Sequence, residues 1–161
     1  MLTQELVNYL FIYRDGVLYW NRSTNPRKVP NGSKAGKENK DGYLETQIKK
    51  KKYGNHRIIF LMFNGFLPEQ VDHKDNDITN NHIENLRAAT YAQNQANAKI
   101  RKDNTTGVKN VKFSKKCGKY EVSMQLKGKK YFFGYYSDLN EAALVAKEKR
   151  IELYGEFARH G

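Results

Sequence analysis

A short polar segment in the middle of the chain carries the residues whose types could hydrolyse a phosphodiester. Asp72 and His73 are adjacent, and Asn85 and Asn94 follow His73 at successive separations of twelve and nine. Hydrolysis of a phosphodiester needs an activated water, relief of the phosphate charge and stabilisation of the leaving oxygen. An imidazole suits the first task, and a hard divalent cation suits the other two. If Asp72 and His73 end a strand, their side chains point to opposite faces, which could separate a metal ligand from a base.

The spacing of these four residues resembles the HNH nuclease family, in the variant whose third signature residue is Asn rather than His. The signature residues would be His73, Asn85 and Asn94, and Asp72 is the acidic residue before the first His. The resemblance implies a ββα-metal fold in which Asp72 and Asn94 bind one divalent ion, Mg²⁺ with Mn²⁺ as a substitute. It also implies that His73 is the general base. Asn85 would lie on the second strand and brace the loop that carries His73.

Other polar residues of the same segment are expected to have simpler roles. Lys74 could contact a phosphate or could be exposed without a function. His82 is expected at a loop surface, His56 in a structural role, and His160 in the tail. Asn and Asp favour turn conformations, so five residues are expected to form only a polar turn: Asp75, Asn76, Asp77, Asn80 and Asn81.

The charge of the chain is typical of a protein that binds nucleic acid. The net charge is +12 and the pI is about 9.7. Residues 1–66 have a net charge of +7, residues 67–100 of −2, and residues 101–161 of +7. A protein that bound DNA by charge alone would have little reason to concentrate carboxylates between two basic segments. An enzyme that holds a divalent cation against DNA would have a reason to concentrate carboxylates there.

The cysteine count and the hydropathy pattern narrow the class of protein further. The single cysteine, Cys117, excludes an internal disulfide and a thiolate-rich zinc site, which favours an oxygen-ligated metal in a reducing compartment. No stretch approaches the run of about 20 apolar residues that crosses a membrane. We therefore expect a cytoplasmic protein, in the bacterial host cytoplasm if it is phage-encoded, with no membrane partner.

Turn and periodicity signals predict an α+β fold in two parts. We expect a nuclease domain with N-terminal β-hairpins at residues 1–100, a linker at 101–106 and a DNA-binding domain at 107–161. In the first part, Asp15-Gly16 predicts a hairpin turn, and the basic run 49–52 could add phosphate contacts. The other elements expected there are a loop at 21–41, a strand at 42–48, a helix at 56–63, and a helix capped by Thr90 that extends through Ala98.

The last third predicts a three-stranded antiparallel sheet and one helix. The strands are expected at 108–114, 119–126 and 129–135, and the helix begins at Asp138. Period-two alternation directs Tyr120, Val122, Met124 and Leu126 of the middle strand toward the helix. In the third strand it directs Tyr131 and Phe133 the same way. The side chains left on the opposite face are Glu121, Ser123, Gln125, Lys130 and Phe132.

This third resembles the apetala-two (ethylene-response-factor) DNA-binding domain. The resemblance rests on the sequences Gly107-Val108-Lys109-Asn110-Val111, Gly118-Lys119-Tyr120, Phe133-Gly134-Tyr135-Tyr136, Glu141-Ala142-Ala143 and Tyr154-Gly155-Glu156-Phe157-Ala158. The family places its sheet in the major groove, so the five outward side chains and Lys109 are implied as DNA contacts. An outward Phe132 could meet a thymine methyl or merely cover the sheet. Several arginines of the plant pattern are replaced, and this implies tolerant recognition.

Together the two resemblances indicate a phage-encoded, homing-type HNH endonuclease that acts on double-stranded DNA. It would be a monomer if it nicks one strand and a dimer if it cuts both. The main alternative is a non-catalytic DNA-binding or regulatory protein that keeps the nuclease scaffold. A second alternative, an RNA-directed protein, lacks an aromatic platform signature in the sequence.

Overall fold

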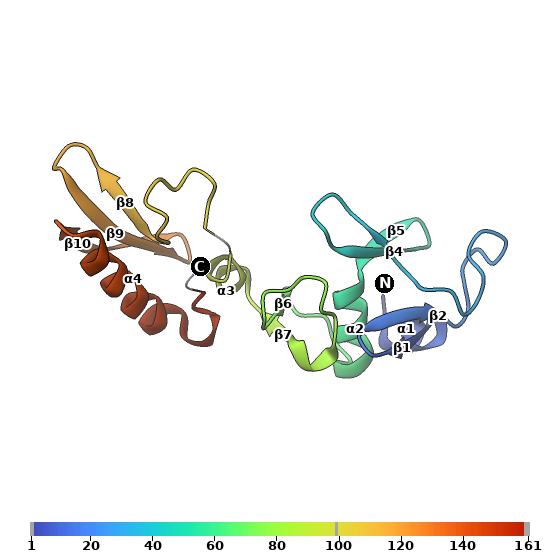
Figure 1. The fold of residues 1–161 in the computed structure, drawn as a ribbon. Helices are drawn as coiled ribbons and strands as arrows, with labels where there is room; N and C mark the ends of the chain where they lie inside the picture. Colours follow the sequence, from blue (N-terminus) through green and yellow to red (C-terminus); the bar gives the residue numbers. More distant parts are fainter. Residues whose placement is uncertain (1, 99, 160–161) are drawn as a thin grey trace. The chain divides into compact units, whose positions relative to one another are not determined.

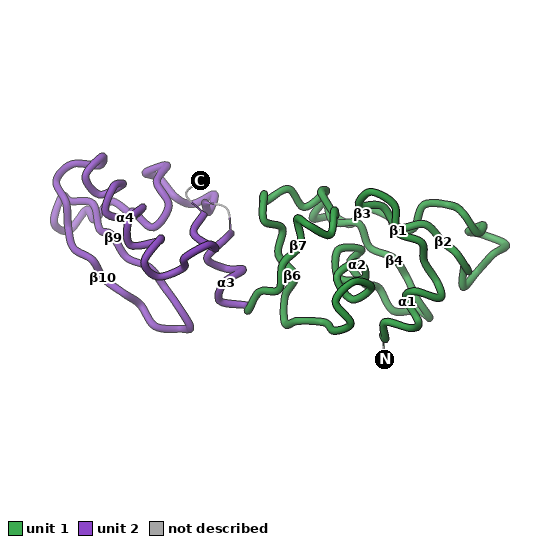
Figure 2. The backbone as a smooth tube through the Cα atoms, turned by 90° about the horizontal axis from the view of Figure 1, so that it is seen from below, with its two compact units in different colours: residues 1–90 green, residues 91–161 purple. Residues whose placement is uncertain are grey.

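The chain folds as an α+β protein with two compact units (Figure 2), residues 1–90 and residues 91–161. The computed structural model describes residues 2–98 and 100–159. Each described sheet is small and antiparallel, with two or three strands. This agrees with the mixed fold class that the sequence predicts. His160 lies outside the described residues.

The first unit begins with a helix and then alternates strands with one further helix (Figure 1). Its elements are α1 (Gln4–Leu10), β1 (Phe11–Arg14), β2 (Val17–Trp20), β3 (Lys37–Glu38), β4 (Leu44–Ile48), β5 (Lys51–Gly54), α2 (Asn55–Asn64), β6 (Gln70–His73), the 3₁₀ turn η1 (Ile83–Asn85) and β7 (Leu86–Ala89).

The hairpin predicted at Asp15-Gly16 is present. Strands β1 and β2 pair with Phe11 opposite Trp20, and both turn residues have positive φ, 46° for Asp15 and 79° for Gly16. Two positive φ values in a two-residue loop match the twist of the flanking strands. The preceding helix α1 is a feature that the sequence analysis did not predict, and Thr3 caps it by accepting a hydrogen bond from the Leu6 amide.

A second sheet, in the order β3-β4-β5, holds the basic run. Strand β3 lies inside the segment predicted to be a loop, and β4 falls within the predicted strand. Lys49 and Lys50 form the turn between β4 and β5 with φ values of 47° and 67°. Both side chains are exposed, so the turn presents positive charge to solvent.

Helix α2 forms the centre of the first core. The predicted helix at 56–63 is confirmed as Asn55–Asn64, and Gly65 ends it in the left-handed region at φ 77°. Ile58 and Ile59 are fully buried. The buried side chains of this core are Val7, Leu10, Phe11, Leu18, Trp20, Ala35, Ile48, Ile58, Ile59, Phe60, Leu61, Val71 and Leu86. Val71 and Leu86 anchor β6 and β7 to α2, and this positions the polar residues that follow Val71.

The second unit consists of a short helix followed by the predicted sheet and helix. Its elements are α3 (Tyr91–Ala96), β8 (Val111–Ser114), β9 (Lys119–Leu126), β10 (Lys129–Tyr136), α4 (Leu139–Tyr154) and the 3₁₀ turn η2 (Gly155–Phe157). The sheet order is β10-β9-β8. Asp138 caps α4 by accepting a hydrogen bond from the Glu141 amide. The compact unit begins at Tyr91, so α3 and the predicted linker at 101–106 both lie within it.

The alternation of β9 separates a helix-facing side from an outward side. Val122 and Met124 are buried with Ala142 and Ala146 of α4. Phe133 of β10 packs against the same core, while Phe132 is 53% exposed. The register of β10 then shifts between Phe132 and Gly134, a β-bulge that the sequence analysis did not predict.

Within residues 2–98 and 100–159, no helix is long and apolar enough to cross a membrane.

Asn55 provides a test of how the first unit is held together. Its side chain is 2% exposed; its Oδ1 accepts from the Thr46 hydroxyl at 2.7 Å and its Nδ2 donates to the Ala35 carbonyl at 2.9 Å. Asn55→Ala leaves both partners buried without that bond, so we expect a loss of about 2–3 kcal/mol in the free energy of unfolding. Urea denaturation measures this loss. The control Asn8→Ala, at an exposed helix position, should change stability by less than about 0.5 kcal/mol.

Candidate active site

The candidate site of the first unit lies at the end of the β6–β7 pair. In this pair Asp72 lies opposite Arg87 and His73 lies opposite Leu86. Asp72 is 6% exposed and His73 is 4% exposed. Because they are consecutive in a strand, their side chains point to opposite faces, as the sequence predicts. Buried polar groups of this kind need partners, and the two residues have different ones.

Asp72 is bound by a guanidinium from the neighbouring strand. The Nε and Nη2 atoms of Arg87 each lie 2.8 Å from Oδ2 of Asp72. Such a charge-assisted contact fixes the orientation of the carboxylate and offsets its charge. Cross-strand pairing explains it, because residues directly opposite each other on two strands have neighbouring side chains. The sequence analysis did not identify Arg87.

His73 is oriented by an amide from the following loop. Its Nε2 lies 3.0 Å from Oδ1 of Asn81, and Asn81 is itself buried. When this amide oxygen accepts the hydrogen bond, Nε2 carries the proton and Nδ1 keeps the lone pair that a general base needs. Asn81 was expected only to form a turn, so its contact with His73 is a second feature that the sequence interpretation missed.

Asn85 connects the two ends of the loop after His73. Its Nδ2 donates to Oδ1 of Asp75 at 2.9 Å and to the Asn80 carbonyl at 2.8 Å, and its Oδ1 accepts from the Asp75 amide at 3.1 Å. The residue closes η1 just before β7, one position short of the strand on which it was predicted. Its hydrogen bonds nevertheless span the loop that joins His73 to β7.

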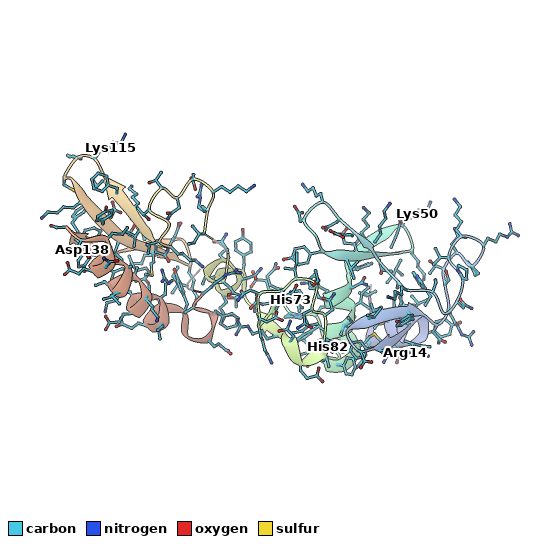
Figure 3. The ribbon with its side chains drawn as sticks, viewed as in Figure 1. Arg14, Lys50, His73, His82, Lys115 and Asp138 are labelled. Carbon is cyan, nitrogen blue, oxygen red and sulfur yellow. The ribbon has the colours of Figure 1, made fainter. Side chains whose placement is uncertain are left out.

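Lys74 and His82 lie on the outer side of this loop. The Lys74 ammonium donates to the Glu84 carbonyl at 2.7 Å, and the side chain is exposed. His82 is also exposed, as expected for a loop residue. Figure 3 shows His73 and His82 in the same region of the first unit. The two histidines thus provide a buried imidazole at the end of β6 and an exposed one in the loop that follows.

Two further rings pack beside His73. The centroid of the His56 ring lies 5.3 Å from that of His73, and the Tyr43 ring lies 5.4 Å from His56 and 6.3 Å from His73. Burial lowers the pKa of His56 to about 3, and the neighbouring charges of His73 and Arg57 act in the same direction. Burial also raises the pKa of Tyr43, with Asp72 as a further cause. His56 was predicted to be only structural, and its place beside His73 was not foreseen.

Asn94, the second predicted metal ligand, lies on α3 in the second unit, where its side chain is half-buried. Among residues 2–98 and 100–159, no three His, Cys, Asp or Glu side chains are grouped so that they could hold a metal. The predicted ligand set of one carboxylate and one amide does not require such a group. Its donor atoms are oxygens, which suit a hard cation that keeps several waters.

The residues predicted to contact DNA on the second unit are held in different ways. The ammonium of Lys130 lies 2.8 Å from the Glu121 carboxylate, and the ammonium of Lys112 lies 3.8 Å from it. The hydrogen bond from Lys130 lowers the pKa of Glu121, although partial burial of the carboxylate acts in the opposite direction. Ser123 also donates to Glu121 at 3.0 Å. Gln125 is exposed and accepts a hydrogen bond at its carbonyl from the Tyr154 hydroxyl.

Lys109 has a different environment from the one implied by the resemblance. Its side chain is 9% exposed, and its ammonium donates to the carbonyls of Ala96 and Ala98. Burial lowers the pKa of this ammonium to about 8. The amine is therefore used to hold the chain after α3, and this argues against its predicted contact with a base.

Comparisons with known proteins found one family match and one relative that cover the candidate site or much of the chain. The model of the HNH endonuclease family matches residues 53–96, a range that contains Asp72, His73, Asn85 and Asn94. Protein 3.8 of Escherichia phage T7 is 34% identical over 106 residues, which are 65% of this chain and 87% of the phage protein. The chain belongs to the family of this phage protein, and its residues 53–96 are similar to the HNH endonuclease family. No solved structure matches the chain.

The range that the HNH model matches differs from that of the first compact unit. The match continues to residue 96 and so includes α3, although the first unit ends at Thr90. It also begins early enough to include His56. Both His56, whose place beside His73 was not predicted, and the predicted ligand Asn94 thus lie within the range that the HNH model matches.

The environment of His56 leads to a prediction about its protonation. A histidine with an ordinary pKa of 6.5 is mostly charged at pH 5, whereas His56, with its pKa lowered to about 3, should remain neutral there. NMR of labelled histidine side chains from pH 8 to pH 4.5 measures this directly. Under denaturing urea the same resonance should titrate near 6.5.

The lowered pKa of His56 also determines how the stability of the fold changes with pH. Between pH 6.5 and about 3 the unfolded chain binds a proton at His56 that the folded chain does not. Stability therefore decreases as the pH falls through this window. A folded-state titration of His56 above pH 5 would contradict the prediction.

Proposed function

We propose that this chain is a metal-dependent HNH endonuclease that hydrolyses phosphodiester bonds in double-stranded DNA. The observation that carries the proposal is the arrangement at the end of β6. There a carboxylate and an imidazole, adjacent in sequence, are buried on opposite faces of the strand and separately oriented by Arg87 and Asn81. A polar pair buried at a strand end is costly to fold, and the match to the HNH model over residues 53–96 supports a catalytic role for it.

In the proposed reaction His73 is the general base. Its Nε2 is held by Asn81, so Nδ1 is the atom that takes the proton from the attacking water. The rings of Tyr43 and His56 pack beside it and restrict its rotation. Asn85 holds the loop after His73 closed through Asp75 and Asn80. These contacts pre-organise the base before the substrate arrives.

Asp72 and Asn94 are the residues that would hold the metal ion. We propose Mg²⁺, with Mn²⁺ as a substitute, because both donors are oxygens and such sites retain several waters. When bound, the ion would offset the charge on the phosphate and stabilise the leaving oxygen. The chain order β6, β7, α3 is the order of strands and helix in the ββα-metal fold that the resemblance implies.

The second unit would bind the duplex. Its three-stranded sheet, backed by α4 on one face, supports the proposed likeness to the apetala-two domain. The outward residues proposed to contact DNA are Glu121, Ser123, Gln125, Lys130 and Phe132. Lys74 and the turn at Lys49 and Lys50 could add phosphate contacts from the first unit. We propose that recognition is tolerant, that the enzyme is of the homing type, and that it acts in the bacterial host.

One observation favours the alternative of a non-catalytic DNA-binding protein that keeps the nuclease scaffold. Arg87 already binds Oδ2 of Asp72 through two nitrogen atoms, and a guanidinium in that place competes with a metal ion for the carboxylate. Catalysis requires that Asp72 still offers an oxygen to the ion beside Arg87. The following experiments separate the two functions.

His73→Ala tests the enzymatic proposal directly. Loss of the base should lower the rate of plasmid cleavage by at least about 100-fold, while affinity for duplex DNA, measured by fluorescence anisotropy, should remain within about two-fold. The matched control is His82→Ala, which removes an exposed imidazole from the same loop and should leave the cleavage rate unchanged. Equal cleavage by both variants would exclude His73 as the base, whereas DNA binding without any cleavage by the unaltered protein would favour the non-catalytic alternative.

Metal dependence provides a second test. Cleavage should stop when EDTA is added and return with an excess of Mg²⁺ or Mn²⁺, since the proposed ligands are too few to retain the ion without substrate. Agarose gels that resolve nicked from linear plasmid measure the product at the same time. A nicked product would indicate a cut in one strand by a single active site, and a linear product would indicate a second cut, made by a dimer or in a second visit. Cleavage that persists in EDTA would contradict the metal site.

A further inference from the structure

A β-bulge on β10 brings two aromatic rings together on the outward face of the second sheet. In a regular strand, residues three positions apart point to opposite faces, so Phe132 and Tyr135 would not meet. Here Phe132 lies opposite Ser123 and Tyr135 opposite Glu121, with the register shifted between Phe132 and Gly134. The ring centroids are 5.1 Å apart. Gly134, at φ 123°, adopts the backbone conformation that the bulge requires.

These two rings are exposed, whereas the neighbouring aromatic side chains of β10 pack against the core. Phe132 is 53% exposed and Tyr135 is 48% exposed, whereas Phe133 and Tyr136 on either side of Gly134 pack against the core. The bulge therefore displays one pair of rings and buries the other. Bulges often re-aim side chains in this way near functional sites.

The surroundings of the two rings are positively charged. Glu121, directly opposite Tyr135, is bound by the ammonium groups of Lys112 and Lys130. Two ammonium groups against one carboxylate leave an excess of positive charge on this face. The Lys112 and Lys130 side chains are 70% and 61% exposed, so both can approach an anion. A polyanion with flat apolar groups would complement such a surface.

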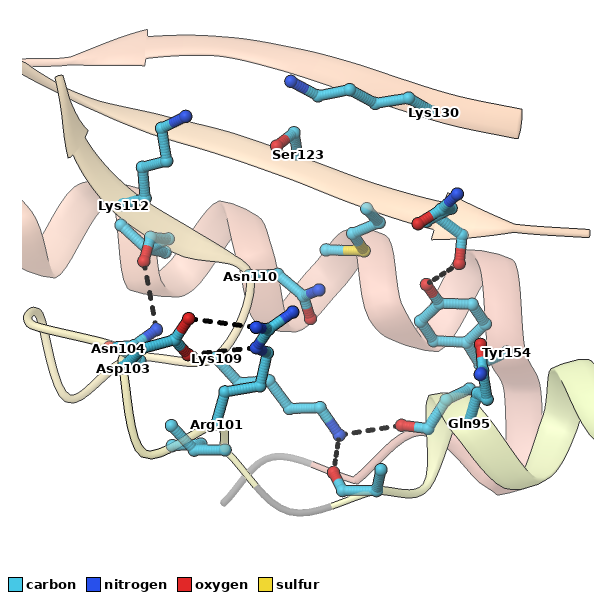
Figure 4. A pocket seen from close by; sticks show the side chains of 16 residues that line it. Gln95, Arg101, Asp103, Asn104, Lys109, Asn110, Lys112, Ser123, Lys130 and Tyr154 are labelled. Carbon is cyan, nitrogen blue, oxygen red and sulfur yellow. Dashed lines mark hydrogen bonds and ion pairs between the residues drawn. The ribbon is translucent and has the colours of Figure 1, made fainter. Parts of the chain in front are cut away.

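A groove lies beside the two rings, between the same sheet and the segment that precedes it. Its volume is about 650 Å³, and its lining includes Lys112, Ser123, Gln125 and Lys130. Ser123 is the cross-strand partner of Phe132, so the groove adjoins the aromatic pair. The loop that carries Arg101 and Asn104 lines it as well; Figure 4 shows these two residues below the strands and Lys112, Ser123 and Lys130 upon them.

We propose that Phe132 and Tyr135 form a stacking platform for unpaired bases of a single DNA strand, whose phosphates lie along the lysines of the adjoining groove. Paired bases in a duplex present only their edges, and one ring would suffice for a thymine methyl. Two exposed rings beside a basic groove match the way proteins bind single strands. The inference rests on the proposed function for the choice of DNA, and it would direct the enzyme to opened or nicked sites.

The test compares binding of matched nucleic acids to the full chain in EDTA, where no cleavage is expected. Fluorescence anisotropy is measured with a labelled 12-nucleotide DNA strand, its duplex, an RNA of the same sequence, and an abasic strand with the same number of phosphates. Phe132→Leu and Tyr135→Leu should each weaken binding of the DNA strand by about 10- to 100-fold. The abasic strand, which keeps the charge but offers no base, should lose less than about two-fold.

The matched control is Phe113→Leu, which removes another exposed ring, 44% exposed, on strand β8 of the same sheet. Phe113 lies opposite Tyr120, a core-facing residue, so its loss should leave binding within about two-fold. The proposal is overturned if Phe132→Leu has no larger effect on the single strand than Phe113→Leu, if Tyr135→Leu weakens duplex binding as much as single-strand binding, if the abasic strand loses as much as the single strand, or if RNA binds more tightly than DNA. Because no cleavage is needed, a failure here is separate from the result with His73→Ala.

Discussion

The candidate site depends on one constraint: buried polar groups must have partners. Asp72 and His73 are both nearly inaccessible at the end of β6, and leaving either without a hydrogen bond would cost free energy comparable to a substantial part of a small domain's stability. Pairing with β7 brings Arg87 to Asp72, and the loop folds back to bring Asn81 to His73. The same contacts that allow the pair to be buried also orient it, so stability and pre-organisation of the site have one origin.

The same constraint shapes the second unit. Arg150 of α4 is 2% exposed and donates to the Lys109 carbonyl, while the Lys109 ammonium binds the end of α3. Glu121 is buried between two lysines on the outward face. Charges that the sequence presents as candidates for DNA contact are thus partly used to hold the unit together. What remains on the outward face is a smaller set of lysines and the two aromatic rings.

Local patterns in the sequence were sufficient for most elements, and they selected the residues of the candidate site, whose roles stay a prediction. The Asp15-Gly16 turn, the apolar run of α2, the Asp138 cap and the alternation along β9 each depend on neighbours within a few positions. Asp72 and His73 were identified by type and spacing, and their burial on opposite faces follows from strand periodicity. Asn94 was identified in the same way, and its pairing with Asp72 stays a prediction because α3 belongs to the second unit.

Only the tertiary structure decided which distant groups meet. Nothing local relates Arg87 to Asp72 or His56 to His73, because these contacts arise from strand register and from the packing of α2 against β6 and β7. Strict alternation along β10 would have placed Tyr135 on the same face as Phe133, and a one-residue bulge reversed it. The sequence by itself determined the chemistry available in each segment. The fold determined which of those groups bind one another and which remain exposed, because burial and strand register depend on the whole chain.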